Sequence, residues 1–347
     1  MQRWECLLTQ DIIAYPLENS NDSAKEFAFS HERMYNEFME KGIRRVLPIL
    51  SVLLSGILWG VISLFIRELS AAGLSAMQIC FVRLLFAAPI FVIVALAFSP
   101  AHLRIRLRDI WIFLGTGVVS VVLFNYFYFY TIIHSEASVA VVLLYTSPIF
   151  VMLLSALIFK EKVGAEKILA LAMTFIGCIL VSGVTSGGAS LSPLVAFVGV
   201  MSGLFYALYT IFGTFGLRRY DPLTVTAYTF LFAFLASLPI SDLQGVFAIL
   251  SATPSLWLWC AGIAVISTVL PYFFYTWGLR SVEPSRAAIL VAVEPIVGCL
   301  LGMIAYGERH DFPKILGILF VVGAILLLNA PKRSGRRGEG IQPPAKK

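Results

Sequence analysis

The fold is decided by two stretches of sequence, EASVAVVLLYTSPIFVMLLSALIFKEKVGAEKIL at residues 136–169 and EPSRAAILVAVEPIVGCLLGMIAYGERHDFPKIL at residues 283–316. Aligned without a gap at an offset of 147 residues, they share 12 identities in 34 positions. Chance agreement in sequence of this apolar composition would be about 3 identities. Pro148 falls on Pro295 in this alignment. The chain therefore contains two copies of one unit.

The repeat extends beyond these two stretches. The same offset pairs further residues: Glu161 with Glu308, Lys167 with Lys314, Ser55 and Gly56 with Ser202 and Gly203, and Trp59 with Tyr206. These matches lie far apart within each half, so the duplicated unit is a whole half of the chain.

The composition is that of a polytopic membrane protein. Of 347 residues, 59% are apolar and 13% are charged, whereas a soluble domain carries about 25% charged residues. Ten apolar runs each have roughly the 20 residues that cross about 30 Å of hydrocarbon as a helix. They cover residues 46–66, 77–98, 110–132, 138–159, 166–184, 193–216, 222–240, 256–279, 285–306 and 313–330. The fold class that we predict is all-α and integral to the membrane, with ten transmembrane helices.

Lysine and arginine are distributed unequally between alternate connections. One side of the membrane has nineteen of them, and the other has three, which are Arg67, Arg309 and Lys314. Cytoplasmic connections are enriched in these residues. The sequence therefore predicts that both termini are cytoplasmic, in a bacterial-type inner membrane. The same clustering explains the net charge of +6, so we expect no nucleic-acid partner.

Each half contains five apolar runs, an odd number, so the second half enters the membrane from the opposite face. Repeats related by a pseudo-two-fold axis in the membrane plane are characteristic of secondary transporters, which bind solute near the midplane and expose it alternately to each side. The predicted repeats are residues 46–184 and 193–330. We expect the partners to be a small-molecule solute and the lipid bilayer.

Two tails lie outside the repeats. Residues 1–45 are polar, lack the pattern of a signal peptide and are predicted to form a cytoplasmic tail. Met34 and Met39 are alternative start sites. Residues 331–347 are basic and rich in proline and glycine, and this composition predicts disorder.

Residues 46–330 resemble the drug/metabolite transporter superfamily, in its ten-helix EamA-type exporter branch. The motifs that carry the resemblance are LLSGILWG at 53–60, TSPIFVMLLSALIFKEK at 146–162 and VEPIVGCLLGMIAYGER at 293–309. The resemblance implies ten helices around a central cavity and export of a small metabolite, commonly an amino acid or a related organic solute. Arg67 and Glu68 depart from the pattern, because many relatives carry a lone lysine there.

Glu294 and Pro295 lie in the middle of the ninth apolar run. An acid at this depth costs roughly 2.5–3.5 kcal/mol on insertion scales, and a proline removes a backbone hydrogen bond. In one interpretation, Glu294 faces the cavity and couples transport to protons or binds a substrate amine. In the other, it hydrogen-bonds carbonyl groups that Pro295 frees. Ser147 and Pro148 occupy the matching positions of the fourth run, and paired interruptions indicate a transport site unless the kinks only shape packing.

Arg83 is the only lysine or arginine deep within an apolar run. One interpretation pairs it with Glu294, or with a carboxylate of the solute, because a lone buried charge is costly. The alternative is that its side chain extends to the outer membrane surface, about six residues away along the run.

Aromatic and polar residues repeat at helical spacing in both halves. The offset pairs Asn125 with Tyr272 and Tyr128 with Tyr275. In each half the two residues are three positions apart, so their side chains share one face of the helix. The candidates for lining the pathway are Trp59, Asn125, Tyr128, Tyr206, Tyr209, Tyr272 and Tyr275. An aromatic cavity of this kind suits a planar or amphipathic solute. The alternative is that these residues are interfacial anchors or packing groups.

Glu161 and Glu308 close the fourth and ninth runs among basic residues. Each is interpreted as a helix-end ion pair or cap. The alternative is a gate latch that breaks as the two halves move.

Nothing in the sequence indicates a cofactor or a metal site. The five cysteines form no CxxC pair, and the four histidines are scattered. No P-loop, HExxH or GxSxG motif is present, which disfavours ATP hydrolysis and a membrane-embedded lipid-modifying enzyme. A channel or a scaffold is disfavoured by the inverted repeat. Two points stay open: coupling to protons, and uptake or exchange of a nucleoside-like or sulfonium metabolite in place of export.

Overall fold

The computed structural model describes residues 46–98, 103–135, 137–182, 192–306 and 312–330. The predictions made for the two tails and for Glu308 and Arg309 lie outside these ranges. Contacts divide the chain into two units, Met1–Leu47 and Pro48–Lys347, and the second unit contains the helical bundle.

Every regular element in the described ranges is helical, and ten of the helical stretches are long and apolar enough to span a membrane. The prediction of ten spans is confirmed. Numbered in chain order as spans 1 to 10, they are Val46–Ala71, Ala76–Phe98, Leu107–His134, Val139–Phe159, Ala165–Ser182, Pro193–Leu217, Pro222–Ile240, Leu256–Leu279, Pro284–Ala305 and Phe312–Asn329.

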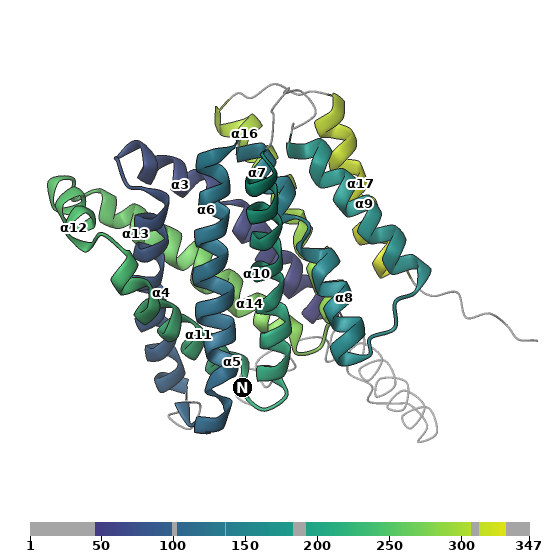
Figure 1. Ribbon diagram of the computed structural model, residues 1–347, viewed down its shortest axis with the longest axis horizontal. Coiled ribbons are helices and arrows are strands. Elements are labelled where there is room, and N and C mark those ends of the chain that lie inside the picture. Colours follow the sequence, from purple (N-terminus) through teal and green to yellow (C-terminus); the bar gives the residue numbers. More distant parts are fainter. Residues whose placement is uncertain (1–45, 99–102, 136, 183–191, 307–311, 331–347) are drawn as a thin grey trace, which may run out of the picture. The chain divides into compact units, whose positions relative to one another are not determined.

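Several spans consist of more than one helical element (Figure 1). Span 1 combines residues 46–60 with α3 (Ile62–Ala71), and span 3 combines η2 (Leu107–Asp109), α5 (Ile110–Leu114), η3 (Gly115–Leu123) and α6 (Phe124–His134). Span 4 consists of α7 (Ala137–Leu144) and α8 (Ser147–Phe159), and span 7 consists of α11 (Pro222–Ser237) and η5 (Leu238–Ile240). Span 8 consists of α13 (Leu256–Ala264), η6 (Val265–Val269) and α14 (Leu270–Leu279). Span 9 consists of α15 (Pro284–Leu290), η7 (Val291–Val293) and α16 (Glu294–Tyr306). The single helices are α4 (Ala76–Phe98), α9 (Ala165–Ser182), α10 (Pro193–Leu217) and α17 (Phe312–Asn329), and α12 (Leu243–Ala252) is a short helix between spans 7 and 8.

Local sequence signals set several helix ends. Proline is the first residue of α10, α11 and α15, where a helix needs no backbone donor. The Ser192 side chain caps α10 by accepting a hydrogen bond from the Val195 amide. At the C-terminal end of span 4, Lys160 takes a left-handed conformation with φ of 56° and ends α8.

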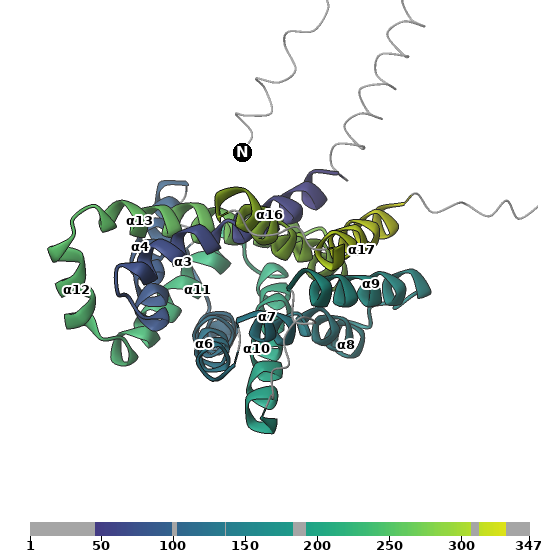
Figure 2. The ribbon, with the colours of Figure 1, turned by 90° about the horizontal axis from the view of Figure 1, so that it is seen from above.

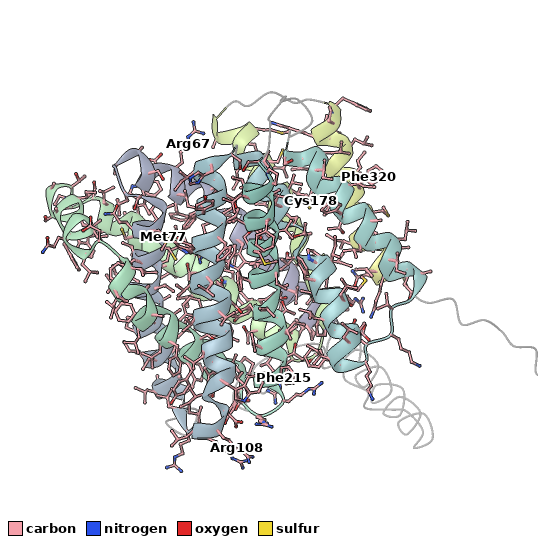
Figure 3. The ribbon with its side chains drawn as sticks, viewed as in Figure 1. Arg67, Met77, Arg108, Cys178, Phe215 and Phe320 are labelled. Carbon is pink, nitrogen blue, oxygen red and sulfur yellow. The ribbon has the colours of Figure 1, made fainter. Side chains whose placement is uncertain are left out.

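The two repeats run in opposite directions through the bundle. The offset of 147 residues aligns Arg67, near the end of span 1, with Thr214, which precedes Phe215 near the end of span 6. Figure 3 shows Arg67 at one edge of the bundle, and Arg108 and Phe215 at the opposite edge. We call these the Arg67 edge and the Arg108 edge. Equivalent spans therefore end on opposite sides, as an inverted repeat requires.

Glycine contacts repeat across the seam between the halves. A Cβ on Gly56 would lie 2.8 Å from the Val291 carbonyl oxygen in span 9, and one on Gly203 would lie 3.0 Å from the Leu143 carbonyl oxygen in span 4. Each glycine thus packs against the interrupted span of the other half, which allows the backbones to approach closely.

The equivalent spans 5 and 10 pack against each other, and their helices α9 and α17 lie side by side in Figures 1 and 2. There Gly177 and Gly317 meet, and a Cβ on either would lie within 2.9 Å of the carbonyl oxygen of the other.

Helix irregularities also repeat. Span 4 is interrupted by a turn at residues 145–146, and span 9 by the 3-10 segment η7 at Val291–Val293. Spans 3 and 8 carry the π-helical segments η3 and η6, and the offset places residues 115–123 on 262–270. π-Helical turns are rare and concentrate at functional sites, so these four spans are the natural location of one.

Candidate functional site

Two neighbouring cavities in the bundle share part of their walls, and the larger has a volume of about 120 Å³ and reaches Ile66 and Ala76, near the Arg67 edge. Its wall is built from helical stripes, in which residues three or four apart share one face. Spans 1, 2 and 3 contribute Trp59, Ile62, Ile66, Ala76, Ile79, Cys80, Arg83, Phe124, Asn125, Tyr128 and Phe129, and the remaining wall is Leu144, Tyr206, Tyr272 and Glu294. The cavity is thus formed by both repeats.

The smaller cavity, of about 20 Å³, lies on the side of the Arg108 edge. It is lined by Ser147, Pro148 and Val151 of span 4, by Tyr206, Ala207, Tyr209 and Thr210 of span 6, and by Trp59, Tyr145, Tyr272, Tyr275, Ala288 and Val291. Two hydrogen bonds between spans 6 and 8 hold its aromatic rings: one joins the hydroxyl groups of Tyr209 and Thr276 at 2.8 Å, and the other joins those of Thr210 and Tyr275 at 2.7 Å.

A layer of three aromatic side chains separates the two cavities. Trp59, Tyr206 and Tyr272 line both of them. The Trp59 ring centroid lies 5.0 Å from that of Tyr272 and 6.5 Å from that of Tyr206, edge to face in both cases. We call these three residues the aromatic layer. Its members thus form a wall that the two cavities share.

Glu294 begins α16 directly after the 3-10 segment of span 9. Its side chain is half-buried and lines the larger cavity. Tyr145 lies close enough to interact with the Glu294 carboxylate, although its hydroxyl makes no hydrogen bond of ordinary geometry within the described part of the chain. The carboxylate is therefore accessible from the larger cavity.

Arg83 lines the same cavity, and its Nε donates a hydrogen bond of 3.0 Å to the Thr268 hydroxyl oxygen. Thr268 belongs to the π-helical segment of span 8, and its own hydroxyl donates to the Ile263 carbonyl oxygen at 3.0 Å. Among the described residues, no ion pair joins Arg83 to Glu294. The two opposite charges thus face one cavity, and the arginine acts electrostatically on the Glu294 carboxylate without forming a direct ion pair with it.

The structure brings together nearly all of the residues that the sequence singled out. Every candidate for lining the pathway, binding the solute or coupling lines one of the two cavities except Pro295, which adjoins Glu294 in the chain. Asn125 is less available than its neighbours, because its side-chain amide donates to the Val121 carbonyl oxygen at 2.6 Å.

Two residues of the site were missed by the sequence analysis. Tyr145, at the interruption of span 4, falls opposite Ala292 in the repeat, so the comparison of the halves does not single it out. Its place three residues before Pro148 is a usable signal. Thr268 carries no signal, because a threonine in an apolar run commonly bonds its own helix backbone.

An ionic cluster lies near the Arg108 edge, where spans 4, 5 and 9 meet. The Lys167 ammonium lies 2.6 Å from the Glu161 carboxylate and 2.7 Å from that of Glu283, and Glu161 also accepts a hydrogen bond from the Ser285 hydroxyl. We call these four residues the Glu161 cluster. Glu161 and Lys167 come from the first repeat and Glu283 and Ser285 from the second, so the predicted helix-end ion pair also joins the two halves.

No group of three or more histidine, cysteine or acidic side chains that could hold a metal ion occurs within the described ranges.

The comparisons with known proteins agree with this architecture. The family model described as "EamA-like transporter family" matches residues 46–183 and again residues 193–330. An "Uncharacterized transporter" of Archaeoglobus fulgidus is 28% identical over 80% of this chain and 94% of its own length. The "Uncharacterized inner membrane transporter YicL" of Salmonella typhimurium is 29% identical over 83% of this chain and 97% of its own.

One solved crystal structure has the same fold. It superposes with a TM-score of 0.69 at 16% identity, covering 82% of this chain and 96% of that one.

Proposed function

Because the chain belongs to the EamA-like transporter family, we propose that it is a secondary carrier that exports a small metabolite, an amino acid or a related organic solute, by alternating access. The observation that supports this most is the pair of cavities on either side of the aromatic layer. Both are lined by residues of the two repeats, at the interruptions of spans 4 and 9. A solute in the larger cavity reaches the smaller one once the aromatic layer rearranges.

In this proposal the structure is a state in which the Arg108 side is closed. The larger cavity faces the Arg67 edge, while the Glu161 cluster joins the two halves at the other edge. Glu161 and Lys167 are almost buried, with side chains 6% and 10% exposed, and such a pair opens only if water or new partners replace it. We infer that the Glu161 cluster is a latch that holds the Arg108 side shut.

The latch is tested by removing its central pair in the double variant Glu161→Gln/Lys167→Met. We expect a cysteine introduced at Ala288, in the smaller cavity, to react at least about tenfold faster with a thiol reagent added from the Arg108 side, which corresponds to about 1.4 kcal/mol. The reaction rate is measured in membrane vesicles of known orientation, with the native cysteines replaced.

The matched control is Arg280→Met, which removes the exposed ion pair with Asp221 near the same edge. Its partners are about half exposed, at 54% and 49%, and surface pairs contribute little. Equal labelling rates in the double variant and in this control would show that the Glu161 cluster stabilises the structure but is not a latch.

We propose further that both termini are cytoplasmic and that the protein resides in a bacterial-type inner membrane, as the distribution of basic residues predicts. The Salmonella relative is also named as an inner membrane transporter. The orientation places the Arg108 edge in the cytoplasm and the Arg67 edge outside.

The orientation is tested with single cysteines at His134 and Ser281, which are exposed at the ends of spans 3 and 8. In intact cells whose outer membrane has been removed, an impermeant maleimide should label His134→Cys and leave Ser281→Cys unlabelled. Permeabilised cells supply the control, because both positions should then react. Labelling of both in intact cells would contradict the inverted arrangement itself.

Transport is tested by solute counterflow in proteoliposomes. We expect saturable exchange of at least one preloaded radiolabelled metabolite, since a carrier cycles whether or not a gradient drives it. Net loss of label against an opposing gradient establishes export, and net gain establishes the uptake alternative. Flux that does not saturate with solute would indicate a channel.

A further inference from the structure

The larger cavity holds an arginine to which the transport cycle described above gives no role. We propose that Arg83 is an anion-binding subsite, so that the transported solute is a zwitterion whose anionic group binds Arg83 and whose cationic group faces Glu294. The inference rests on the proposed function, since it concerns the solute of the same cavity.

Arg83 has unused hydrogen-bonding capacity. A guanidinium carries five N–H donors and stays charged at any pH a cell experiences. Thr268 is the one hydrogen-bond partner of Arg83 among the described residues, and it takes the Nε donor. The terminal nitrogens are left for another acceptor, and two parallel N–H donors match a carboxylate.

Arg83 is also held in position. The Thr268 hydroxyl donates its proton to the Ile263 carbonyl oxygen, so only its lone pairs remain to accept the Arg83 N–H. Thr268 lies in the π-helical segment η6, five residues beyond Ile263, and it lines a separate small cavity of about 10 Å³ that shares Arg83 with the larger one. A braced guanidinium loses little freedom when it binds an anion.

The charges of the cavity also favour a solute that carries both signs. A charge within a membrane protein is costly unless a partner compensates it. Arg83 and Glu294 line one cavity, yet they form no ion pair with each other within the described part of the chain. A solute with one negative and one positive group placed between them would compensate both charges at once.

The dimensions and walls of the cavity limit the solute further. A volume of about 120 Å³ holds a small molecule, and Trp59, Tyr206 and Tyr272 form its floor. These rings accept an apolar substituent and also attract a cationic group through their π faces. The chemistry is that of a compact zwitterion with a modest apolar part.

The experiment compares three matched sets of compounds by counterflow in proteoliposomes: the common α-amino acids, the amines left when their carboxylate is removed, and the acids left when their amine is removed. We expect exchange of at least one amino acid, and at least about 100-fold weaker exchange of its two analogues, because a site built to pair a group rejects a ligand that lacks it. Exchange of amines alone or of acids alone overturns the zwitterion and leaves transport intact.

The variant Arg83→Gln should lose exchange of the amino acid by about 100-fold while its exchange of the matching amine is unchanged or improved, because the amine has no anionic group to lose. Arg83→Lys keeps the charge but not the paired donors, and should fall between the wild type and Arg83→Gln. Folding of each variant is checked by its elution as a single species in detergent. Equal loss for amino acid and amine in folded Arg83→Gln protein would contradict an anion subsite.

Thr268→Val tests the positioning role. It should raise the KM for the amino acid about tenfold, with little change in the maximal rate or in the KM for the amine, because a loosened guanidinium binds its anion less well. The double variant Arg83→Gln/Glu294→Gln separates the remaining alternative. If the two side chains served only to neutralise each other, the double variant would exchange the amino acid like the wild type, and that result overturns the proposal.

A negative result in all three compound sets overturns the zwitterion, because the inference requires that one amino acid be exchanged. Whether the protein still acts as a carrier is then decided without any solute. Cysteines at Ile66, in the larger cavity, and at Ala288, in the smaller one, should each react with reagent from their own side only. Alternation between the two labelling patterns supports a carrier that takes another solute.

Discussion

If Glu294 couples transport to protons, as one interpretation of the sequence holds, replacing it by glutamine should abolish the pH dependence of transport and leave the protein folded. The larger cavity gives the Glu294 carboxylate access to protons from one side, and the interrupted backbone of span 9 places it at the start of α16. Glutamine has nearly the shape of protonated glutamate but cannot release a proton. The exchange that remains after the cationic group of the solute loses its partner should therefore vary less than about twofold between about pH 5.5 and pH 8, and an imposed proton gradient should no longer drive accumulation.

The matched control is Glu68→Gln, which removes an exposed acid in α3 near the Arg67 edge. It should keep the pH profile of the wild type. Flux that is still proton-driven in Glu294→Gln would show that the acid serves the backbone interruption instead, as the alternative interpretation of the sequence holds.

The second large effect is expected from Gly203→Val in span 6. A Cβ at Gly203 would lie 2.4 Å from the Thr146 hydroxyl oxygen, 3.0 Å from the Leu143 carbonyl oxygen and 3.1 Å from that of Leu144. The two carbonyls belong to the interruption of span 4 and cannot rotate away as a side chain does. We expect a loss of about 3 kcal/mol in stability, and transport at background level because span 4 no longer packs against span 6. Thermal unfolding in detergent measures the first and counterflow the second.

Gly213→Ala, on the same helix, is the matched control. The nearest atom to its added Cβ is a side-chain carbon of Leu279 at 3.6 Å, an ordinary contact. This variant should be neutral or stabilising by about 0.5–1 kcal/mol, because alanine is the better helix former. The symmetry-related variant Gly56→Val should resemble Gly203→Val, since it meets the Val291 backbone in the same way. A mild effect at both seam glycines would show that the two halves are less tightly packed than the structure indicates.

The architecture was predictable because the features that determine it can be read directly from the order of residues along the chain. Spans show as apolar runs whose length matches the bilayer, and the duplication shows as identities at a constant offset, such as Pro148 with Pro295. An odd number of spans in each half then requires inversion. The paired interruptions of spans 4 and 9 also follow, since a proline disturbs a helix wherever it packs.

The lining of the cavities was predictable only in part. Tyr128 and Tyr275 could be proposed because the repeat selects them, but nothing in the apolar runs says which face of a helix meets the cavity. In water, a polar face marks the outside of a helix. In a membrane, lipid and protein interior are equally apolar, so this signal is lost. Tyr145 was missed because its repeat partner is Ala292 and no polar face marks its side of the helix, and Pro295 was included although it lines neither cavity.

The sequence by itself determined ten spans, two inverted halves and an acid beside a proline in the middle of span 9. Only the tertiary structure decided what the charged groups meet: Arg83 binds Thr268, 185 residues away, and Glu161 binds Ser285, 124 residues away. Such contacts depend on the rotation of each helix about its axis and on π-helical and 3-10 turns that shift that rotation. These are properties of packing, and no periodicity of the sequence records them.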